Sequence, residues 1–201
     1  MSKVTSEHAV AVLYLIILMT TATSWLSLVI KSVNKRDEDK RVTIEAERII
    51  PVQKTYREDL LNNCIEHIKK YESLGKTRYW DNDSSITIGY GHHILKGEHF
   101  ANIITEDEAD KLLRADFNNY IEYAKKYTDV YNEQLALGMF LYNFGETKFK
   151  GSTLRKLIED QKPIDNEIIK WKHFRYNGKK RSNRGLLERR RFELSIYNLN
   201  K

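Results

Sequence analysis

The sequence contains few of the residues that crosslink a chain or interrupt its regular structure. Among 201 residues there are one cysteine, two prolines and nine glycines. A single cysteine, Cys64, excludes an intramolecular disulfide and a zinc site built from several cysteines. So little proline and glycine excludes collagen-like and Pro-rich low-complexity chains. The chain is also too short for an α/β barrel, which requires about 250 residues, so we expect one ordinary domain with an additional segment.

The charges are nearly balanced. Thirty-four Lys and Arg oppose 28 Asp and Glu, which gives a net charge of +6, and 41% of the residues are hydrophobic. Such a composition supports a packed core and excludes wholesale disorder. Residues 56–201 carry 26 basic and 22 acidic side chains, a net charge of +4. This excess is too small to indicate a nucleic-acid partner, and we expect none.

The N-terminal segment holds the longest uncharged run. Residues 9–30 contain no charged side chain, and 22 residues are enough to cross the roughly 30 Å hydrocarbon core of a bilayer as a helix. We therefore expect a membrane anchor within residues 1–30. Two other interpretations stay open: an export signal cleaved at the small residues 22–24, and a buried helix of a soluble domain.

The charges that flank this run bear on its orientation. Only Lys3 precedes it, whereas five Lys and Arg follow it within residues 31–41. The positive-inside rule would then place the rest of the chain in the cytoplasm. Residues 31–55 are charged and contain no glycine, so they are interpreted as a linker that is helical in part. The globular domain is expected over residues 56–201.

Apolar spacing and turn-forming residues predict the start of this domain. Leu60, Cys64 and Ile68 recur at helical spacing, which predicts an amphipathic helix over residues 56–71 with Cys64 buried in its apolar stripe. Residues 73–91 combine turn formers with short Tyr, Trp, Ile and Thr runs. They predict a hairpin or small three-stranded sheet, with turns near Gly75 and at residues 81–85.

The remainder is predicted to be helical. A Thr-x-x-Glu capping box at Thr105 opens a helix that extends to about residue 126. Further helices are predicted over residues 133–142 (ending near Gly145), 153–160 (capped by Ser152), 164–174 and 185–197. The fold class is therefore α+β, mainly helical with a small β lobe.

Three residues of the predicted β lobe carry a recognisable chemistry. Glu72, Asp81 and Thr87 follow the spacing Glu-x8-Asp-x5-Thr. The turn near Gly75 folds the chain back, so that both carboxyl groups can face one cleft. Glycoside hydrolysis uses such a pair, one protonated and one ionised, on the two sides of the bond to be broken. The Thr87 hydroxyl can hold a water molecule. Two carboxylates at this spacing are weak evidence alone, because the chain has 28 acidic residues.

The residues around this triplet resemble a known family. Thr87 opens the string Thr-Ile-Gly-Tyr-Gly-His over residues 87–92. This string, with the preceding Glu and Asp, resembles the signature of the phage-type lysozymes, glycoside hydrolase family 24. Tyr142-Asn143-Phe144-Gly145 and the Gly-Leu-x-x-Arg-Arg-x-x-Glu motif of residues 185–193 are similar to later motifs of that family. The resemblance covers about residues 58–198 in the expected order.

The resemblance implies a lysozyme-like fold in which the β lobe lines the active-site cleft. It implies Glu72 as general acid, Asp81 as second carboxylate and Thr87 as the residue that positions the attacking water. The implied substrate is peptidoglycan, cleaved with inversion at the β-1,4 bond between N-acetylmuramic acid and N-acetylglucosamine. No metal or organic cofactor is implied. Substrate contacts are predicted for Tyr90, His92 and Asn143.

The most basic segment of the chain lies near its end. Residues from Lys170 to Arg191 include ten basic side chains and one acidic one. They are interpreted either as a solvated face or as a cationic patch for anionic envelope polymers. We expect a monomer that is anchored in a membrane, with its catalytic domain on the cell-wall side.

Other functions stay open on the sequence alone. The chain could be an inactive peptidoglycan-binding or tethering protein, a cationic protein that disrupts membranes, or a lytic transglycosylase. The presence of Asp81 and Thr87 favours hydrolysis over transglycosylation, because a transglycosylase would need only the acid. The phage-lysis, wall-remodelling and competition roles are not distinguished.

Overall fold

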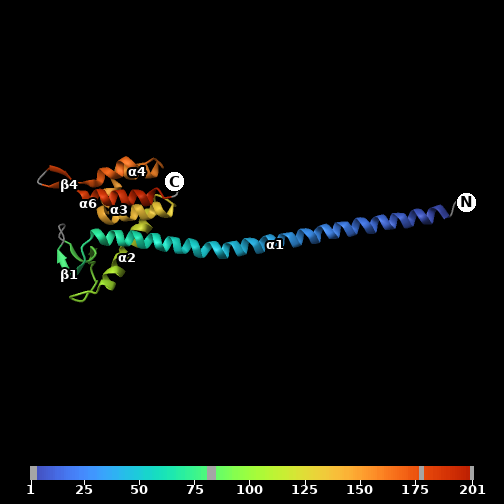
Figure 1. Cartoon of the computed structure of the whole chain (residues 1–201), viewed down its shortest axis with the longest axis horizontal. Helices are drawn as coiled ribbons and strands as arrows, with labels where there is room; N and C mark the ends of the chain where they lie inside the picture. Colours follow the sequence, from blue (N-terminus) through green and yellow to red (C-terminus); the bar gives the residue numbers. More distant parts are fainter. Residues whose placement is uncertain (1–3, 81–84, 177–178, 200–201) are drawn as a thin grey trace. The chain divides into compact units, whose positions relative to one another are not determined.

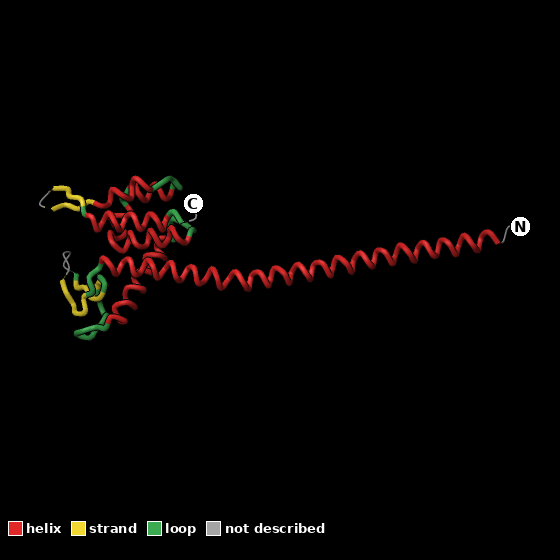
Figure 2. The backbone as a smooth tube through the Cα atoms, in the orientation of Figure 1, coloured by secondary structure: helices red, strands yellow, loops and turns green. Residues whose placement is uncertain are grey.

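The computed structural model describes residues 4–80, 85–176 and 179–199. Side chains are described for these residues except 4–24, 48, 175, 176, 179 and 180. The chain divides into two units, Met1–Arg57 and Glu58–Lys201. Most of the chain is helical, and the described strands form a three-stranded and a two-stranded sheet (Figures 1 and 2).

The first unit is helical. Helix α1 extends over Val4–Tyr71 and continues through Pro51, so the residues predicted as a charged linker are helical throughout. Residues with good helix propensity and the absence of glycine account for this. Val42, Ile49 and Val52 are exposed.

The predicted membrane span falls largely on residues whose side chains are not described. Among the described residues, no helix is long and apolar enough to cross a membrane. The predicted run begins at residue 9, and side chains are described only from residue 25 onward. The membrane anchor therefore stays a prediction.

The second unit begins with the last turns of α1 and a three-stranded antiparallel sheet. Its strands are β1 (Gly75–Trp80), β2 (Ile86–Gly89) and β3 (His92–His93), in that order. The predicted small sheet is confirmed, but the turn predicted near Gly75 is wrong, since Gly75 begins β1 and pairs with Gly89. A Cβ atom at Gly75 would lie 2.5 Å from the ring of Tyr79, so a larger residue there would require this partly exposed ring to move. Residues 81–84 of the other predicted turn lie outside the described residues.

Four longer helices follow the sheet or close the chain. They are α2 (Glu106–Ala124), α3 (Tyr131–Lys150), α4 (Thr153–Glu159) and α6 (Arg184–Tyr197). The capping box at Thr105 and the Ser152 cap are both present, so these predicted helix starts are confirmed. Helix α3 is longer than expected because a second helical segment follows Gly145, whose φ of 75° interrupts the helix as predicted.

One predicted helix is confirmed only in part. Residues 164–174 form only a short helix α5 (Asp165–Ile168) and a 3-10 turn η1 (Ile169–Lys172). The chain then enters a hairpin of β4 (His173–Tyr176) and β5 (Lys179–Ser182), which the helical prediction missed. The sequence does hold a hairpin signal, because the dipeptide Asn-Gly at residues 177–178 separates the two strands.

The core of the second unit lies where α1, α2, α3 and α6 pack. Phe117 of α2 and Phe140 of α3 are fully buried there. Cys64 is also fully buried, as predicted. Its burial, with a smaller contribution from the charge of Glu193, raises the pKa of the thiol to about 12, so Cys64 acts as a small apolar residue.

Candidate active site

Glu72 lies immediately after α1 and is held by an arginine from α6. Its Oε1 accepts a hydrogen bond of 2.6 Å from Nη1 of Arg189, and Nη2 of Arg189 donates to the carbonyl oxygen of Tyr71 at 3.0 Å. Both side chains of this ion pair are largely but not fully buried. A two-pronged guanidinium contact of this kind fixes the position of the carboxyl group.

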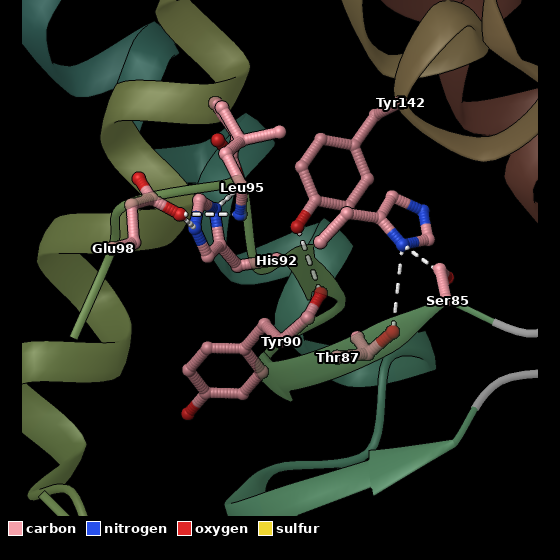
Figure 3. A network of polar contacts seen from close by, with 9 residues as sticks. Ser85, Thr87, Tyr90, His92, Leu95, Glu98 and Tyr142 are labelled. Atoms are coloured by element: carbon pink, nitrogen blue, oxygen red, sulfur yellow. Dashed lines mark hydrogen bonds and ion pairs between the residues drawn. The ribbon is translucent and has the colours of Figure 1, made fainter. Parts of the chain in front are cut away.

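Thr87 lies on β2, where its side chain is 1% exposed. The pairing of β2 with β3 places it opposite His93. Thr87 Oγ1 lies 3.4 Å from His93 Nδ1, and the hydroxyl of Ser85 lies 2.7 Å from the same nitrogen (Figure 3). The Thr87 hydroxyl is therefore part of a small polar cluster at the start of β2.

Asp81 lies outside the described residues, so the structure does not place it. The residues on both sides are described, because Trp80 ends β1 and pairs with Ile86 at the start of β2. The Trp80 side chain is 72% exposed.

Tyr142 links α3 to the β lobe. This tyrosine comes from α3, and its hydroxyl donates to the carbonyl oxygen of Tyr90 at 2.8 Å. Burial is the largest cause of its raised pKa, and the negative charges of Asp116 and Glu72 raise the pKa further. The carboxyl group of Glu72 therefore lies within electrostatic reach of the residue that supports the lobe.

Comparison with known proteins identifies the family and the fold. The family model for phage lysozyme matches residues 69–193, a segment that contains the whole Glu72–Thr87 motif. The chain belongs to the phage lysozyme family. Membership of this family makes the chain a glycoside hydrolase that acts on peptidoglycan.

Individual relatives agree with this assignment. The chain is 31% identical over 136 residues to an endolysin of Acyrthosiphon pisum secondary endosymbiont phage 1, covering 65% of this chain and 91% of that protein. It is 34% identical over 140 residues to an endolysin of Bacillus phage B103, covering 66% of this chain and about half (51%) of that protein. Among solved structures, the muramidase domain of SpmX from Asticaccaulis excentricus is 25% identical with a TM-score of 0.59, covering 68% of this chain and 95% of that one.

His92 of this lysozyme has protein partners on both ring nitrogens. Nδ1 lies 2.9 Å from Asp116 on α2, and Nε2 lies 3.0 Å from Glu98, which also accepts a hydrogen bond from the backbone of Leu95. Burial lowers the pKa of His92, but the hydrogen bonds and charges of Asp116 and Glu98 raise it by more. His92 thus ties the β lobe and the loop after β3 to α2, and its predicted substrate contact stays a prediction.

Tyr90 and Asn143 also contact other protein groups. Tyr90 is buried, and its hydroxyl donates to Glu106 at 3.3 Å. Asn143 is half-buried, and its Oδ1 accepts a hydrogen bond from Arg190 at 3.3 Å. The predicted contacts of both residues with substrate are therefore untested, and the structure shows them supporting neighbouring elements.

The basic segment does not lie wholly on the surface. Arg190 is fully buried and pairs with Glu193 at 2.5 Å, while Arg189 holds Glu72. These two arginines correct the interpretation of the whole segment as a solvated face or a cationic patch. The sequence prediction missed both roles, although the Arg-Arg-x-x-Glu motif holds part of the signal: helical spacing brings Arg189 and Arg190 within reach of Glu193, and only the packing shows that Arg190 pairs with it.

The described residues do not group as a metal site. No three His, Cys, Asp or Glu side chains among them come together in a way that could hold a metal ion. The groups available for chemistry in the described part of the site are thus a carboxyl group, hydroxyl groups and an imidazole.

Proposed function

We propose that this lysozyme hydrolyses the β-1,4 bond between N-acetylmuramic acid and N-acetylglucosamine with inversion of configuration. Glu72 is the general acid, Asp81 the second carboxylate and Thr87 the residue that positions the attacking water. The observation that carries the proposal is the fixed position of Glu72. Arg189 holds this carboxyl group at the end of α1, from which the chain enters the sheet that bears Thr87.

The contact with Arg189 leaves one carboxyl oxygen of Glu72 for chemistry. Arg189 donates to Oε1, and among the described residues no donor reaches Oε2. A proton on Oε2 can therefore be transferred to the glycosidic oxygen as the bond to the sugar breaks. Arg189 prevents rotation of the group without occupying the oxygen that carries the proton.

In the same step, the attack takes place on the opposite face of the sugar. A water molecule attacks the anomeric carbon there, and Asp81 receives its proton. Inverting enzymes hold their two carboxyl groups about 6.5–9.5 Å apart to leave room for this water. Thr87 orients the water from β2, and a transglycosylase would have no use for such a residue.

The test compares Glu72→Gln with wild type in the full-length protein. Purified peptidoglycan is the substrate, and new reducing ends are counted. Glu72→Gln is expected to lower kcat by about 100-fold or more, because it removes the only proposed acid. Glu159→Gln, a matched change at an exposed ion pair of α4, is expected to keep wild-type activity. Proton NMR of the first product anomer tests inversion.

Three results would contradict parts of this proposal. Equal release of reducing ends by wild type and Glu72→Gln would exclude Glu72 as the acid and would mean that another residue supplies the proton. Products with 1,6-anhydro ends would show a lytic transglycosylase. Tight binding to peptidoglycan by both proteins with no new ends from either would show a binding or tethering protein.

We also propose that residues 9–30 tether the enzyme to a membrane, with the catalytic unit on the cell-wall side and wall lysis as the result. The length of the uncharged run supports the tether, whereas the basic residues after it favour the opposite orientation. Protease treatment of intact spheroplasts separates the two orientations. Degradation of the catalytic unit supports the proposed one, and full protection contradicts it.

A further inference from the structure

A second histidine, beside His92, contacts the residue proposed to position the water. His93 is exposed on β3, directly opposite Thr87 on β2. Its Nδ1 atom lies between two hydroxyl groups, 2.7 Å from Ser85 Oγ and 3.4 Å from Thr87 Oγ1. In Figure 3, dashed lines join one imidazole nitrogen to the hydroxyl groups of Ser85 and Thr87, which are both labelled.

The two neighbouring histidines cannot have the same role. Successive side chains of a strand point to opposite faces of the sheet. His92 is buried, and both of its nitrogens are engaged by carboxylates. Among the described residues, the hydrogen-bond partners of the His93 side chain both lie at Nδ1. They are the hydroxyl groups of Thr87, on β2, and of Ser85, the residue before β2.

The chemistry of the attacking water explains why this contact matters. The water must present a lone pair to the anomeric carbon and direct its protons toward acceptors. A threonine hydroxyl can accept a hydrogen bond from the water only through a lone pair that faces it. The hydroxyl proton of Thr87 must therefore point elsewhere, toward an acceptor of its own. His93 Nδ1 is the acceptor that the described structure places beside Thr87.

We propose that His93 is a positioning residue that sets the orientation of the Thr87 hydroxyl. In the tautomer with the proton on Nε2, the single lone pair of Nδ1 is shared by the hydroxyl protons of Ser85 and Thr87 in a bifurcated hydrogen bond. Ser85, at the shorter distance, holds the ring in place. Thr87 Oγ1 then turns a lone pair toward the attacking water. This inference rests on the proposed function, since it assigns Thr87 to the water.

The opposite tautomer would have the opposite effect. With a proton on Nδ1, the ring would donate to the hydroxyl groups, and Thr87 would be free to direct its own proton at the water. That proton would bind one of the two lone pairs of the water and make the water a weaker nucleophile. The proposal therefore requires an acceptor at the position of Nδ1, and it does not require an imidazole.

This requirement selects the variants for the test. His93→Asn keeps an acceptor oxygen at the place of Nδ1, and His93→Leu keeps a branched side chain without an acceptor. His99→Leu is the matched control, because His99 is exposed in the loop after β3 and outside the site. Each variant is made in the full-length protein, and kcat and KM are measured on soluble glycan strands together with thermal unfolding.

We expect His93→Leu to lower kcat about five- to tenfold, the effect of one neutral hydrogen bond, with little change in KM. We expect His93→Asn to recover most of that loss and His99→Leu to match wild type. Equal kcat for His93→Leu and wild type would overturn the inference. An equal loss in His93→Leu and His93→Asn would overturn it as well, because the acceptor would then not be the feature that matters.

A change confined to KM would show that His93 contacts the substrate instead, and would also overturn the inference. Thr87→Ala separates this inference from the proposed function. A large loss of kcat in Thr87→Ala with no effect of His93→Leu leaves the proposed function intact and removes the role of His93. Wild-type kcat in Thr87→Ala contradicts both.

Discussion

Replacing Arg190 by methionine tests the buried ion pair of α6. Arg190 is fully buried and Glu193 is 2% exposed, and their 2.5 Å ion pair is the only hydrogen bond that the carboxyl group of Glu193 makes with described residues. The guanidinium also packs over the rings of Phe140 and Phe144, where the straight methionine side chain can take its place. The substitution therefore removes the charge and keeps most of the packing.

The magnitude follows from the pKa of Glu193. Burial raises this pKa to about 7, against the lowering effect of Arg190. Without Arg190 the folded-state pKa rises further, while the unfolded-state value is unchanged. A raised folded-state pKa contributes stability that is present at low pH and lost as pH rises through it. Above pH 7 the free energy of unfolding of the variant therefore falls, relative to that of wild type, by up to about 1.4 kcal/mol per pH unit. The total is about 3 kcal/mol by pH 9.

The assay is urea unfolding followed by tryptophan fluorescence at pH 6 and pH 9. Trp171 packs on Phe140 and Phe144 beside the ion pair, so it reports on this region. Groups shared by both proteins cancel in the difference between them. We expect a small difference in the free energy of unfolding at pH 6 and a large one at pH 9.

The double variant Arg190→Met/Glu193→Leu is the control. Its free energy of unfolding should differ from that of wild type by the same amount at both pH values, because it buries no unpaired carboxyl group. If the free energies of unfolding of Arg190→Met and wild type differ by the same amount at pH 6 and pH 9, the reasoning is refuted. That result would mean that Glu193 is not the group left without its partner.

Three further substitutions test other contacts by urea unfolding. His92→Gln should be less stable than wild type by about 1–3 kcal/mol at pH 6. This difference in stability should shrink as pH rises above 6.5, because Asp116 and Glu98 raise the pKa of His92 and favour its charged form. A difference that does not change with pH would contradict this role of the two carboxylates. Gly89→Ala should cost about 1–2 kcal/mol, because Gly89 has a φ of 68°; an unchanged midpoint would show that the strand shifts to accept alanine. Thr105→Ala should lower the free energy of unfolding by about 1 kcal/mol, because it removes the capping box of α2. Thr105→Ser keeps the hydroxyl group and should lower it much less.

Local signals in the sequence predicted most of the helices and the small sheet. The capping residues Thr105 and Ser152 act within one turn of their own helices, so the sequence alone places those helix starts. The spacing of Glu72, Asp81 and Thr87, with the string that follows, likewise identified the family and the candidate site. The hairpin of β4 and β5 is not predicted by apolar periodicity, because its strands, His-Phe-Arg-Tyr and Lys-Lys-Arg-Ser, contain no apolar run, and the Asn-Gly dipeptide between them is the one local signal for it.

The partners of the site residues were decided only by the tertiary structure. Arg189 lies 117 residues from Glu72 along the chain, and no spacing rule pairs residues so far apart. The basic segment shows the same limit: composition counts its charges, but only the packing of α6 shows that Arg190 is inside and that Arg189 holds the proposed acid. Sequence determines which chemical groups are present and which local structures they favour, whereas the contact between distant groups depends on how the helices and the sheet pack.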